Sequence, residues 1–291
     1  MTGQGTAPRI LVLGATGMLG NAMLRFLTAD PALDVMATAR ASDAKSCFEP
    51  AIAKRIVCGF DAQDRDSLAG VFADHTPDVM INCIGLVKQL GQSKDVLAAV
   101  PINTMLPHRL ARLCKVAGAR LIHFSTDCVF TGEKGNYLES DPADANDVYG
   151  LSKFLGEVTD PHTITLRTSM IGRELASNRS LIDWFLSQSG SVKGYRRMVF
   201  SGLPTVELAR IVRDYVLPQP ELSGLYHVSA AAISKLDLLR LVADAYDHAI
   251  EIVPDDEIAI DRSLNSARFR AATGYEPPSW PDLVAKMRRF G

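Results

Sequence analysis

Residues 9–28 read RILVLGATGMLGNAMLRFLT, and this stretch decides the fold. The apolar run at residues 9–13 predicts a short, fully buried strand. Glycines follow at positions 14, 17 and 20, and an amphipathic run at residues 18–28 predicts a helix. A buried strand that leads through glycines directly into a helix is typical of a parallel sheet with helices on both faces.

The glycine pattern at residues 14–20 also predicts a binding site. Small residues let backbone N–H groups approach a pyrophosphate, and the start of a helix adds a positive partial charge of about half a unit. Because the pattern lies between a strand and a helix, it indicates dinucleotide binding. A tight turn that merely requires glycine is the structural alternative. The residues expected at the cofactor are Gly14, Thr16, Gly17, Met18 and Leu19.

The alternation of strand and helix continues along the first half of the chain. Further strands are expected at residues 34–39, 55–58, 78–83, 119–125 and 163–168, and further helices at residues 65–74 and from 148. Pro101 and Pro107 interrupt a helical region at residues 93–117, so we expect a break and a kink there. This order predicts an α/β fold with a doubly wound parallel sheet, whose ligands bind at the carboxyl ends of the strands.

After about residue 170 the rhythm becomes irregular. Helices are expected at residues 206–216 and 235–247, and strands at residues 225–228 and 251–253. We therefore expect a Rossmann-like dinucleotide-binding domain at residues 1–168. A smaller, mixed, substrate-binding lobe is expected at residues 169–291, with some segments interleaved with the first domain.

The composition excludes several classes of protein. The chain has 291 residues, a formal net charge of −2 and five cysteines, none in a CxxC pair. A net charge this close to zero does not indicate binding to nucleic acid or to an anionic membrane. The cysteines give neither a disulfide framework nor a zinc site, so no metal is expected. Without a leader or a long apolar run, a cytoplasmic protein is expected.

Residues after the second, third and fourth strands bear on the cofactor. Arg40 stands where an acid would suit the ribose of NAD, and an arginine suits a 2′-phosphate, so NADP(H) is expected with NAD(H) as the alternative. Asp61 is expected either to bond the adenine or to hold an ordinary turn. Cys83 and Gly85 are expected either to shape the cofactor wall or to form a plain strand end. Lys88 is expected to lie in solvent, with a contact to a cofactor or substrate phosphate as the alternative.

Tyr149 and Lys153 form the main catalytic candidate. Residues at i and i+4 share one face of a helix. An ammonium about 4 Å from a phenolate, at an effective dielectric of about 20, contributes roughly 4 kcal/mol of attraction. That corresponds to about three pKa units before desolvation opposes it, so the pair could bring the phenol near the operating pH. An exposed helix pair is the structural alternative, but the position after the fifth strand favours catalysis.

Ser125, Thr126 and Asp127 end the fifth strand, where a doubly wound sheet presents its active site. A hydroxyl there can bond a substrate carbonyl and polarise it. A simple turn is the structural alternative, and the Tyr149–Lys153 pair favours the functional interpretation.

Together these motifs resemble those of the extended short-chain dehydrogenase/reductase family, and within it the dTDP-4-dehydrorhamnose reductases and related nucleotide-sugar 4-keto reductases. The resemblance covers nearly the whole chain, and STDCVFTG with the late GLPT and GLYHVS is its most specific part. The motifs are GATGMLG at 14–20, NCIG at 82–85, Ile102-Asn103, STDCVFTG at 125–132, VYGLSK at 148–153, LRTSMIG at 166–172, GLPT at 202–205 and GLYHVS at 224–229.

The resemblance implies a role for each matching residue. Tyr149 would protonate the alkoxide oxygen as hydride arrives. Lys153 would lower the pKa of Tyr149 and hold the nicotinamide ribose, and Thr126 would orient the sugar carbonyl. Gly20 joins the pyrophosphate turn, and Asn103 and Ser125 join the cofactor site. The residues implied at the nucleotide-sugar are Ser125, Thr126, Asp127, Arg167, Arg173 and Arg196.

The resemblance also implies reduction in polysaccharide biosynthesis by an enzyme that forms a homodimer, and leaves two alternatives open. The first is a nucleotide-sugar epimerase or dehydratase. Dehydratases of the family usually follow the Thr-Asp pair with a glutamate, and here Cys128 takes that place, which argues against elimination but not against epimerisation. The second is a non-catalytic regulatory subunit on the same fold, because the regulatory subunit of methionine adenosyltransferase resembles these reductases.

Overall fold

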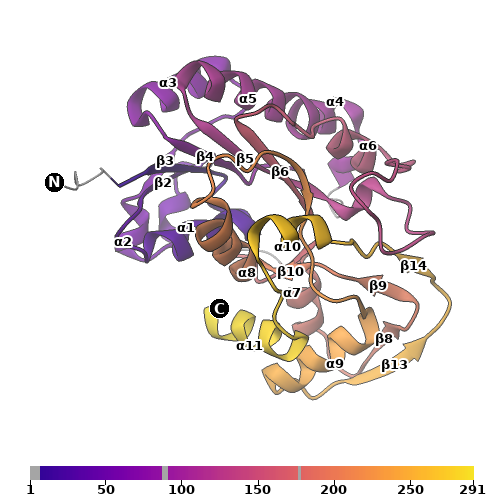
Figure 1. The fold of residues 1–291 in the computed structure, drawn as a ribbon. Helices are drawn as coiled ribbons and strands as arrows, with labels where there is room; N and C mark the ends of the chain where they lie inside the picture. The colour runs from indigo at the N-terminus through magenta and orange to yellow at the C-terminus, as the bar shows by residue number, and fades with distance from the viewer. Residues whose placement is uncertain (1–6, 87–90, 176–177) are drawn as a thin grey trace.

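A seven-stranded parallel sheet forms the centre of the molecule (Figure 1). The computed structural model describes residues 7–86, 91–175 and 178–291. The sheet order is β11-β6-β5-β4-β1-β2-β3, and every pair of neighbours is parallel. The strands are β1 Arg9–Leu13, β2 Asp34–Ala39, β3 Ile56–Cys58, β4 Val79–Asn82, β5 Arg120–Thr126, β6 Thr163–Thr168 and β11 Gly224–His227. The predicted doubly wound α/β fold is confirmed.

The order of the strands places the ligand site. The chain builds outward from β1 through β2 to β3, then returns to the other side of β1 and continues from β4 to β6. The strand order therefore reverses between β1 and β4. In open parallel sheets this reversal leaves a crevice outside the carboxyl ends of the strands, and ligands bind there.

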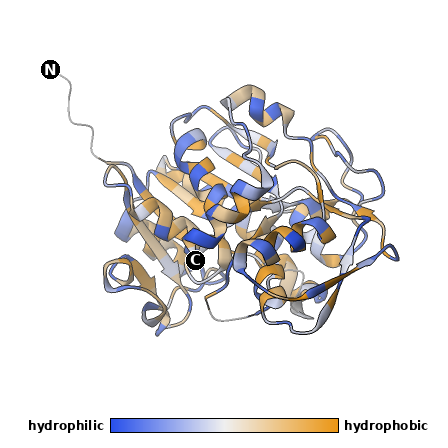
Figure 2. Cartoon of the chain, turned by 90° about the horizontal axis from the view of Figure 1, so that it is seen from below, coloured by the Kyte–Doolittle hydropathy of each residue, from blue (hydrophilic) through white to orange (hydrophobic). Residues whose placement is uncertain are grey.

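Helices cover both faces of the sheet because side chains of a strand alternate between its faces. Ile10 and Val12 of β1 pack into one buried cluster, and Leu11 and Leu13 pack into another on the opposite face. Figure 2 shows the result in colour, with largely hydrophobic central strands and helices that carry both hydrophilic and hydrophobic stretches. The helices are α1 Met18–Thr28, α2 Pro50–Ala53, α3 Arg65–His75, α4 Val96–Ala99, α5 Leu106–Ala117, α6 Val148–Phe154, α7 Leu181–Leu186, α8 Thr205–Ile211, α9 Lys235–Tyr246, α10 Ala267–Thr273 and α11 Trp280–Phe290.

The expected break at the two prolines is wrong. Helix α4 runs directly into a π-helical segment, Val100–Met105, which runs directly into α5. Each proline lies in the first two positions of its segment, and Pro107 stands at the start of α5. The wider π turn accommodates the proline rings, so the helix continues through both positions.

The second half of the chain contributes to the main sheet and also forms small sheets. Strand β11 pairs with β6, so this segment of the second half extends the main sheet. The domain boundary at residue 168 remains a prediction. The small sheets pair β7 Met170–Ile171 with β10 Leu203–Pro204, β8 Ser191–Tyr195 with β13 Glu251–Asp255, and β9 Met198–Phe200 with both β12 Ile233–Ser234 and β14 Ile260–Asp261. None of the helices in the described part of the chain is long and apolar enough to cross a membrane.

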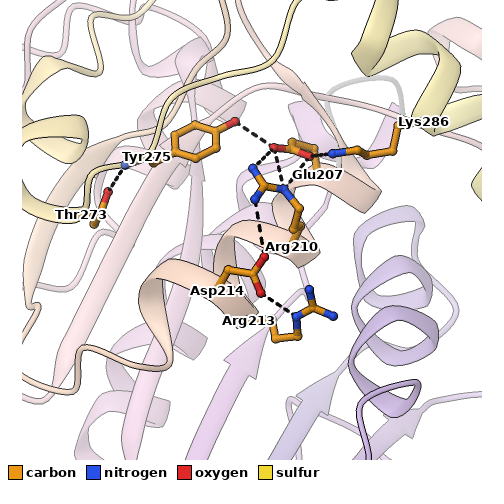
Figure 3. A network of polar contacts seen from close by, with 7 residues as sticks. All are labelled: Glu207, Arg210, Arg213, Asp214, Thr273, Tyr275 and Lys286. Atoms are coloured by element: carbon orange, nitrogen blue, oxygen red, sulfur yellow. Dashed lines mark hydrogen bonds and ion pairs between the residues drawn. The ribbon is translucent and has the colours of Figure 1, made fainter.

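A buried carboxylate fastens the C-terminal helix to the rest of the molecule (Figure 3). Glu207 of α8 is fully buried and accepts hydrogen bonds from Arg210 at 2.6 Å, from Lys286 of α11 at 2.5 Å and from the Tyr275 hydroxyl at 3.1 Å. Burial alone would raise the pKa of Glu207, but the bonds from Arg210 and Lys286 outweigh it and lower this pKa. The network therefore needs an ionised carboxylate, and it holds α8, α11 and the segment after α10 together.

Candidate functional site

A cavity of about 290 Å³ lies at the carboxyl edge of the sheet. One wall is the glycine-rich turn, residues 17–19, and the next is the end of β4, residues 82–86. The end of β5, residues 124–128, and the segment after β6, residues 168–170, complete it, together with Tyr149 and Lys153 of α6. Residues far apart in the sequence thus meet where the strand order reverses, because parallel strands present their carboxyl ends on one side.

The glycine-rich turn has the geometry of an anion site. Gly14 has a φ of +88°, which favours glycine, and its N–H donates to the carbonyl of Thr38 at 3.2 Å. Helix α1 begins after Gly17, and no described side chain caps it or places an acid in its first turn. The first N–H groups of a helix need acceptors, so this uncapped start can bind a phosphate.

The three predicted catalytic residues line one cavity. Asp147 caps α6 by accepting from the N–H of Gly150 at 2.7 Å, and the helix carries both Tyr149 and Lys153. The Thr126 side chain lies close enough to the phenol of Tyr149 to lower the Tyr149 pKa. The ammonium of Lys153 donates to the carbonyl of Phe124 at 2.7 Å. A carbonyl oxygen placed beside both residues would accept from the Tyr149 phenol, and from Thr126 once its hydroxyl proton turns from Asp127 toward the cavity.

The pKa of Tyr149 differs from the sequence-based expectation. Burial raises it, the charges of Cys128 and Asp127 raise it further, and Thr126 opposes the rise. The expected lowering by Lys153 is wrong. Lys153 donates to Phe124, and burial lowers the pKa of Lys153 itself to about 8, with Glu157 opposing the change. Tyr149 is therefore a neutral phenol at neutral pH, which is the form that can donate a proton.

The other residues of the Ser-Thr-Asp motif are also held in place. Ser125 donates to Glu157 at 2.6 Å, and Thr126 donates to Asp127 at 3.2 Å. Asp127 is 7% exposed, and burial raises its pKa. All three line the cavity.

The predicted cofactor residues fall into two groups. Gly17, Met18, Leu19, Cys83 and Gly85 line the cavity. The buried Asn103 does not line it but accepts from the N–H of Leu86 at 2.9 Å and donates to Ser152 at 3.1 Å, so it supports the loop after β4.

Two predicted residues, Arg40 and Asp61, lie outside the cavity wall. Arg40 is exposed two residues after Thr38, whose carbonyl holds the glycine turn. Asp61 is exposed and accepts from Gln63 at 2.9 Å within its own turn. Thr16 is exposed in the glycine turn, and Lys88 lies outside the described residues.

The predicted substrate arginines are not in the cavity. Arg167 is 2% exposed, donates to both oxygens of Glu157 and bonds His227, so its donors are used inside the protein and its assignment to a diphosphate is wrong. Arg173 pairs with Asp183, and Arg196 pairs with Asp256 at 2.7 Å on the surface. A substrate role for Arg173 and Arg196 remains a prediction.

Two residues near the cavity escaped the sequence analysis. Glu157 lies four residues after Lys153, just past the end of α6, and this spacing could have indicated that the two side chains lie on the same side of the chain. Lys235 begins α9, with its ammonium 4.1 Å from the centre of the Phe200 ring and its charge facing Asp127 and Cys128. Burial lowers the pKa of Lys235 to about 8. Among the described residues, no group of three or more His, Cys, Asp or Glu side chains is placed to hold a metal.

Comparison with known proteins gives a family model, several dTDP-4-dehydrorhamnose reductases and also a methionine adenosyltransferase 2 subunit beta of Danio rerio, which is 28% identical over 82% of this chain and 74% of that protein. A family model described as RmlD substrate binding domain matches residues 8–287. A dTDP-4-dehydrorhamnose reductase of Streptomyces griseus is 33% identical over 151 residues, which cover 52% of this chain and 44% of that protein. The matched stretch thus spans less than half of that relative. A dTDP-4-dehydrorhamnose reductase of Aggregatibacter actinomycetemcomitans is 24% identical and is covered to 99%, with 97% of this chain matched.

A solved structure shares the whole fold. The dTDP-4-dehydrorhamnose reductase of Bacillus anthracis, in complex with NADP, matches with a TM-score of 0.79 at 19% identity. The match covers 98% of this chain and 99% of the other. At this identity the likeness shows the common fold.

Proposed function

Because the chain belongs to the RmlD substrate binding domain family, we propose that it reduces the 4-keto group of a nucleotide-activated deoxysugar with NAD(P)H. One observation carries the proposal: Thr126, Tyr149 and Lys153 meet in a cavity that opens at the glycine-rich turn. One protein named dTDP-4-dehydrorhamnose reductase matches 97% of the chain at 24% identity. A homodimer remains a prediction.

The residues present fit a nicotinamide dinucleotide. The uncapped start of α1 suits the pyrophosphate, and the turn after β4 suits the ribose beside the nicotinamide. Arg40 carries the proposal that NADPH is preferred, because a guanidinium pairs well with a 2′-phosphate. The nicotinamide, when bound, supplies the hydride.

The protein's own groups then handle the proton. Thr126 and Tyr149 hold the carbonyl oxygen of the sugar by two hydrogen bonds. As the carbonyl carbon accepts the hydride, the phenol of Tyr149 donates its proton to the carbonyl oxygen, so the ketone becomes an alcohol. Solvent then returns a proton to Tyr149, and the ammonium of Lys153, in the same cavity, would hold the nicotinamide ribose. This order needs a neutral Tyr149 at the start, which is the form that burial favours.

A direct assay tests the proposal. The protein is incubated with NADPH or NADH and a panel of nucleotide-4-keto-6-deoxy sugars, and loss of the reduced nicotinamide is followed. Turnover with a keto sugar is expected. Conversion of an unoxidised nucleotide-sugar without net use of cofactor would instead identify an epimerase. Binding without turnover across the panel would identify a regulatory subunit.

The variant Tyr149→Phe tests the role of the phenol. It should lower kcat by roughly two to four orders of magnitude, the usual contribution of a general acid, and leave the Kd of the cofactor nearly unchanged. Near-normal turnover by this variant would refute the assignment.

A further inference from the structure

A buried carboxylate lies directly behind the catalytic cavity. Glu157 follows the end of α6, and its side chain is 7% exposed. It accepts from the Ser125 hydroxyl at 2.6 Å and from two nitrogens of Arg167 at 2.9 and 2.6 Å. One of its contacts, Ser125, lines the cavity, whereas the other, Arg167, belongs to the interior.

The chain of contacts continues away from the cavity and leaves none of its members unpaired. Arg167 bonds Nε2 of His227 at 2.9 Å, and Nδ1 of His227 bonds the carbonyl of Tyr137 at 3.0 Å. A carbonyl can only accept, so Nδ1 carries the proton and Nε2 accepts from Arg167. Burial lowers the pKa of His227 to about 3, so this ring is neutral. Phe130 covers the guanidinium, 5.0 Å from its ring centre.

The charges near the cavity make Glu157 important to Lys153. The direct acceptor of the Lys153 ammonium is the neutral carbonyl of Phe124, and burial disfavours its charge. The carboxylate of Glu157 acts in the opposite direction and favours the ammonium. Among the other titratable groups near Lys153, His123 of β5 is kept neutral by burial, and Tyr149 and Asp127 line the same cavity. Glu157, whose ion-pair partner is Arg167, thus also carries the negative charge that favours the ammonium form of Lys153.

We propose that Glu157 is a positioning residue of the catalytic cavity: its buried carboxylate holds Ser125 by its hydroxyl and places a negative charge behind the strand end that accepts from Lys153. This role of Glu157 deepens the proposed function and rests on it. It also explains why Arg167 is present: a second cation fixes the carboxylate by two bonds, so Glu157 points toward the cavity wall. Ser125 acts as part of this support, and Thr126 and Tyr149 remain the hydroxyls that face a substrate.

Titration of Lys153 tests the proposal without any substrate. In protein labelled with [¹³C]lysine, the Lys153 signal, assigned with Lys153→Arg, should titrate near pH 8 in the wild type. In Glu157→Gln the midpoint should fall by about one unit, because an opposite charge has been removed. An unchanged midpoint would overturn the proposal. Since this readout needs no turnover, it also separates a failure here from a failure of the proposed reaction.

Two further variants keep the test specific. Glu157→Gln leaves the charge of Arg167 without a partner, which destabilises the fold. The double variant Glu157→Gln/Arg167→Met removes both charges, so the Lys153 midpoint should still fall, but by less than in Glu157→Gln, because the cation of Arg167 is gone as well. Glu207→Gln removes another buried, arginine-bound carboxylate that does not line the cavity, and it should leave the Lys153 midpoint unchanged. An equal shift in Glu207→Gln would show a general loss of structure and would also overturn the proposal.

The activity should follow the same titration. If Lys153 must be charged, the alkaline limb of kcat/KM moves down with its midpoint. A fall from about 8 to about 7 lowers kcat/KM at pH 8 by about five-fold, because the charged fraction falls from about one half to about one tenth. Ser125→Ala removes a bond to Glu157 but no charge, so the alkaline midpoint should stay where it is. A shift in Ser125→Ala equal to that of Glu157→Gln would contradict the charge argument.

Discussion

Alanine at position 20 should damage the fold at the glycine-rich turn. Gly20 is buried in α1, and a Cβ added there would overlap the carbonyl oxygen of Gly14 and lie 2.7 Å from its carbonyl carbon. It would also lie 3.3 Å from the backbone nitrogen of Ala15. These are backbone atoms, so no side chain can rotate to make room. The helix and the turn would have to separate by about 1.5 Å to restore an ordinary contact.

The size of the effect follows from the packing. Forcing an extra methyl into a close-packed interior costs about 1–3 kcal/mol, and occasionally more. For a protein of this size that corresponds to a fall in Tm of roughly 2–4 °C for each kcal/mol. Thermal unfolding of Gly20→Ala, followed by circular dichroism without ligand, should therefore show a Tm several degrees below that of the wild type.

Gly17→Ala is the matched control. Its added Cβ would have one neighbour, the carbonyl oxygen of Gly14 at 3.5 Å, and the φ of Gly17 is −75°, which alanine adopts readily. Its Tm should stay close to that of the wild type. Gly17 lines the cavity, however, so the methyl would occupy space that a pyrophosphate needs, and the Kd for NADPH should rise about ten-fold or more. An unchanged Tm in Gly20→Ala, or unchanged NADPH binding in Gly17→Ala, would refute this account of the turn.

Three further predictions concern other parts of the molecule. Arg40→Asp should raise the Kd for NADPH about ten-fold and change that for NADH much less, and equal effects in a fluorescence titration would remove Arg40 from the 2′-phosphate site. Glu207→Gln should lower the free energy of unfolding by about 3 kcal/mol at pH 7. Folding lowers the pKa of Glu207 from 4.5, so the ionised carboxylate contributes its full stabilisation above that pH. This stabilisation is lost as the pH falls through the lower pKa of the folded state. The free energy of unfolding of the variant should therefore lack this part of the loss in acid. Lys235→Met should raise the KM for the nucleotide-sugar about ten-fold without changing the Kd of the cofactor. The charge of Lys235 faces Asp127, which lines the cavity, from the second half of the chain, so we expect Lys235 to contact the sugar. An unchanged KM would exclude a contact between Lys235 and the nucleotide-sugar.

Local patterns in the sequence were sufficient for the elements of the sheet. Apolar runs bounded by glycine, proline and polar residues predicted β1, β2, β5 and β6 with nearly the observed ends. The two-residue alternation within β1 serves both faces of the sheet, and that signal is carried by neighbouring residues alone. The helix register that unites Tyr149 with Lys153 is equally local.

Tertiary packing decided what the same side chains do. An arginine such as Arg167 looks identical in the sequence whether it faces a diphosphate or an internal carboxylate, and its contact with His227 spans 60 residues. The raised pKa of Tyr149 depends on burial, which no spacing of residues reveals. The place of β11 beside β6 and the meeting of Lys235 with Asp127 likewise require the folded chain. The sequence by itself determined the parallel sheet, the glycine-rich turn and the candidate Tyr-Lys pair, because periodicity and steric permissiveness act over a few residues. Only the tertiary structure decided which charges are buried and paired, because desolvation and Coulomb attraction depend on neighbours that are distant in the sequence.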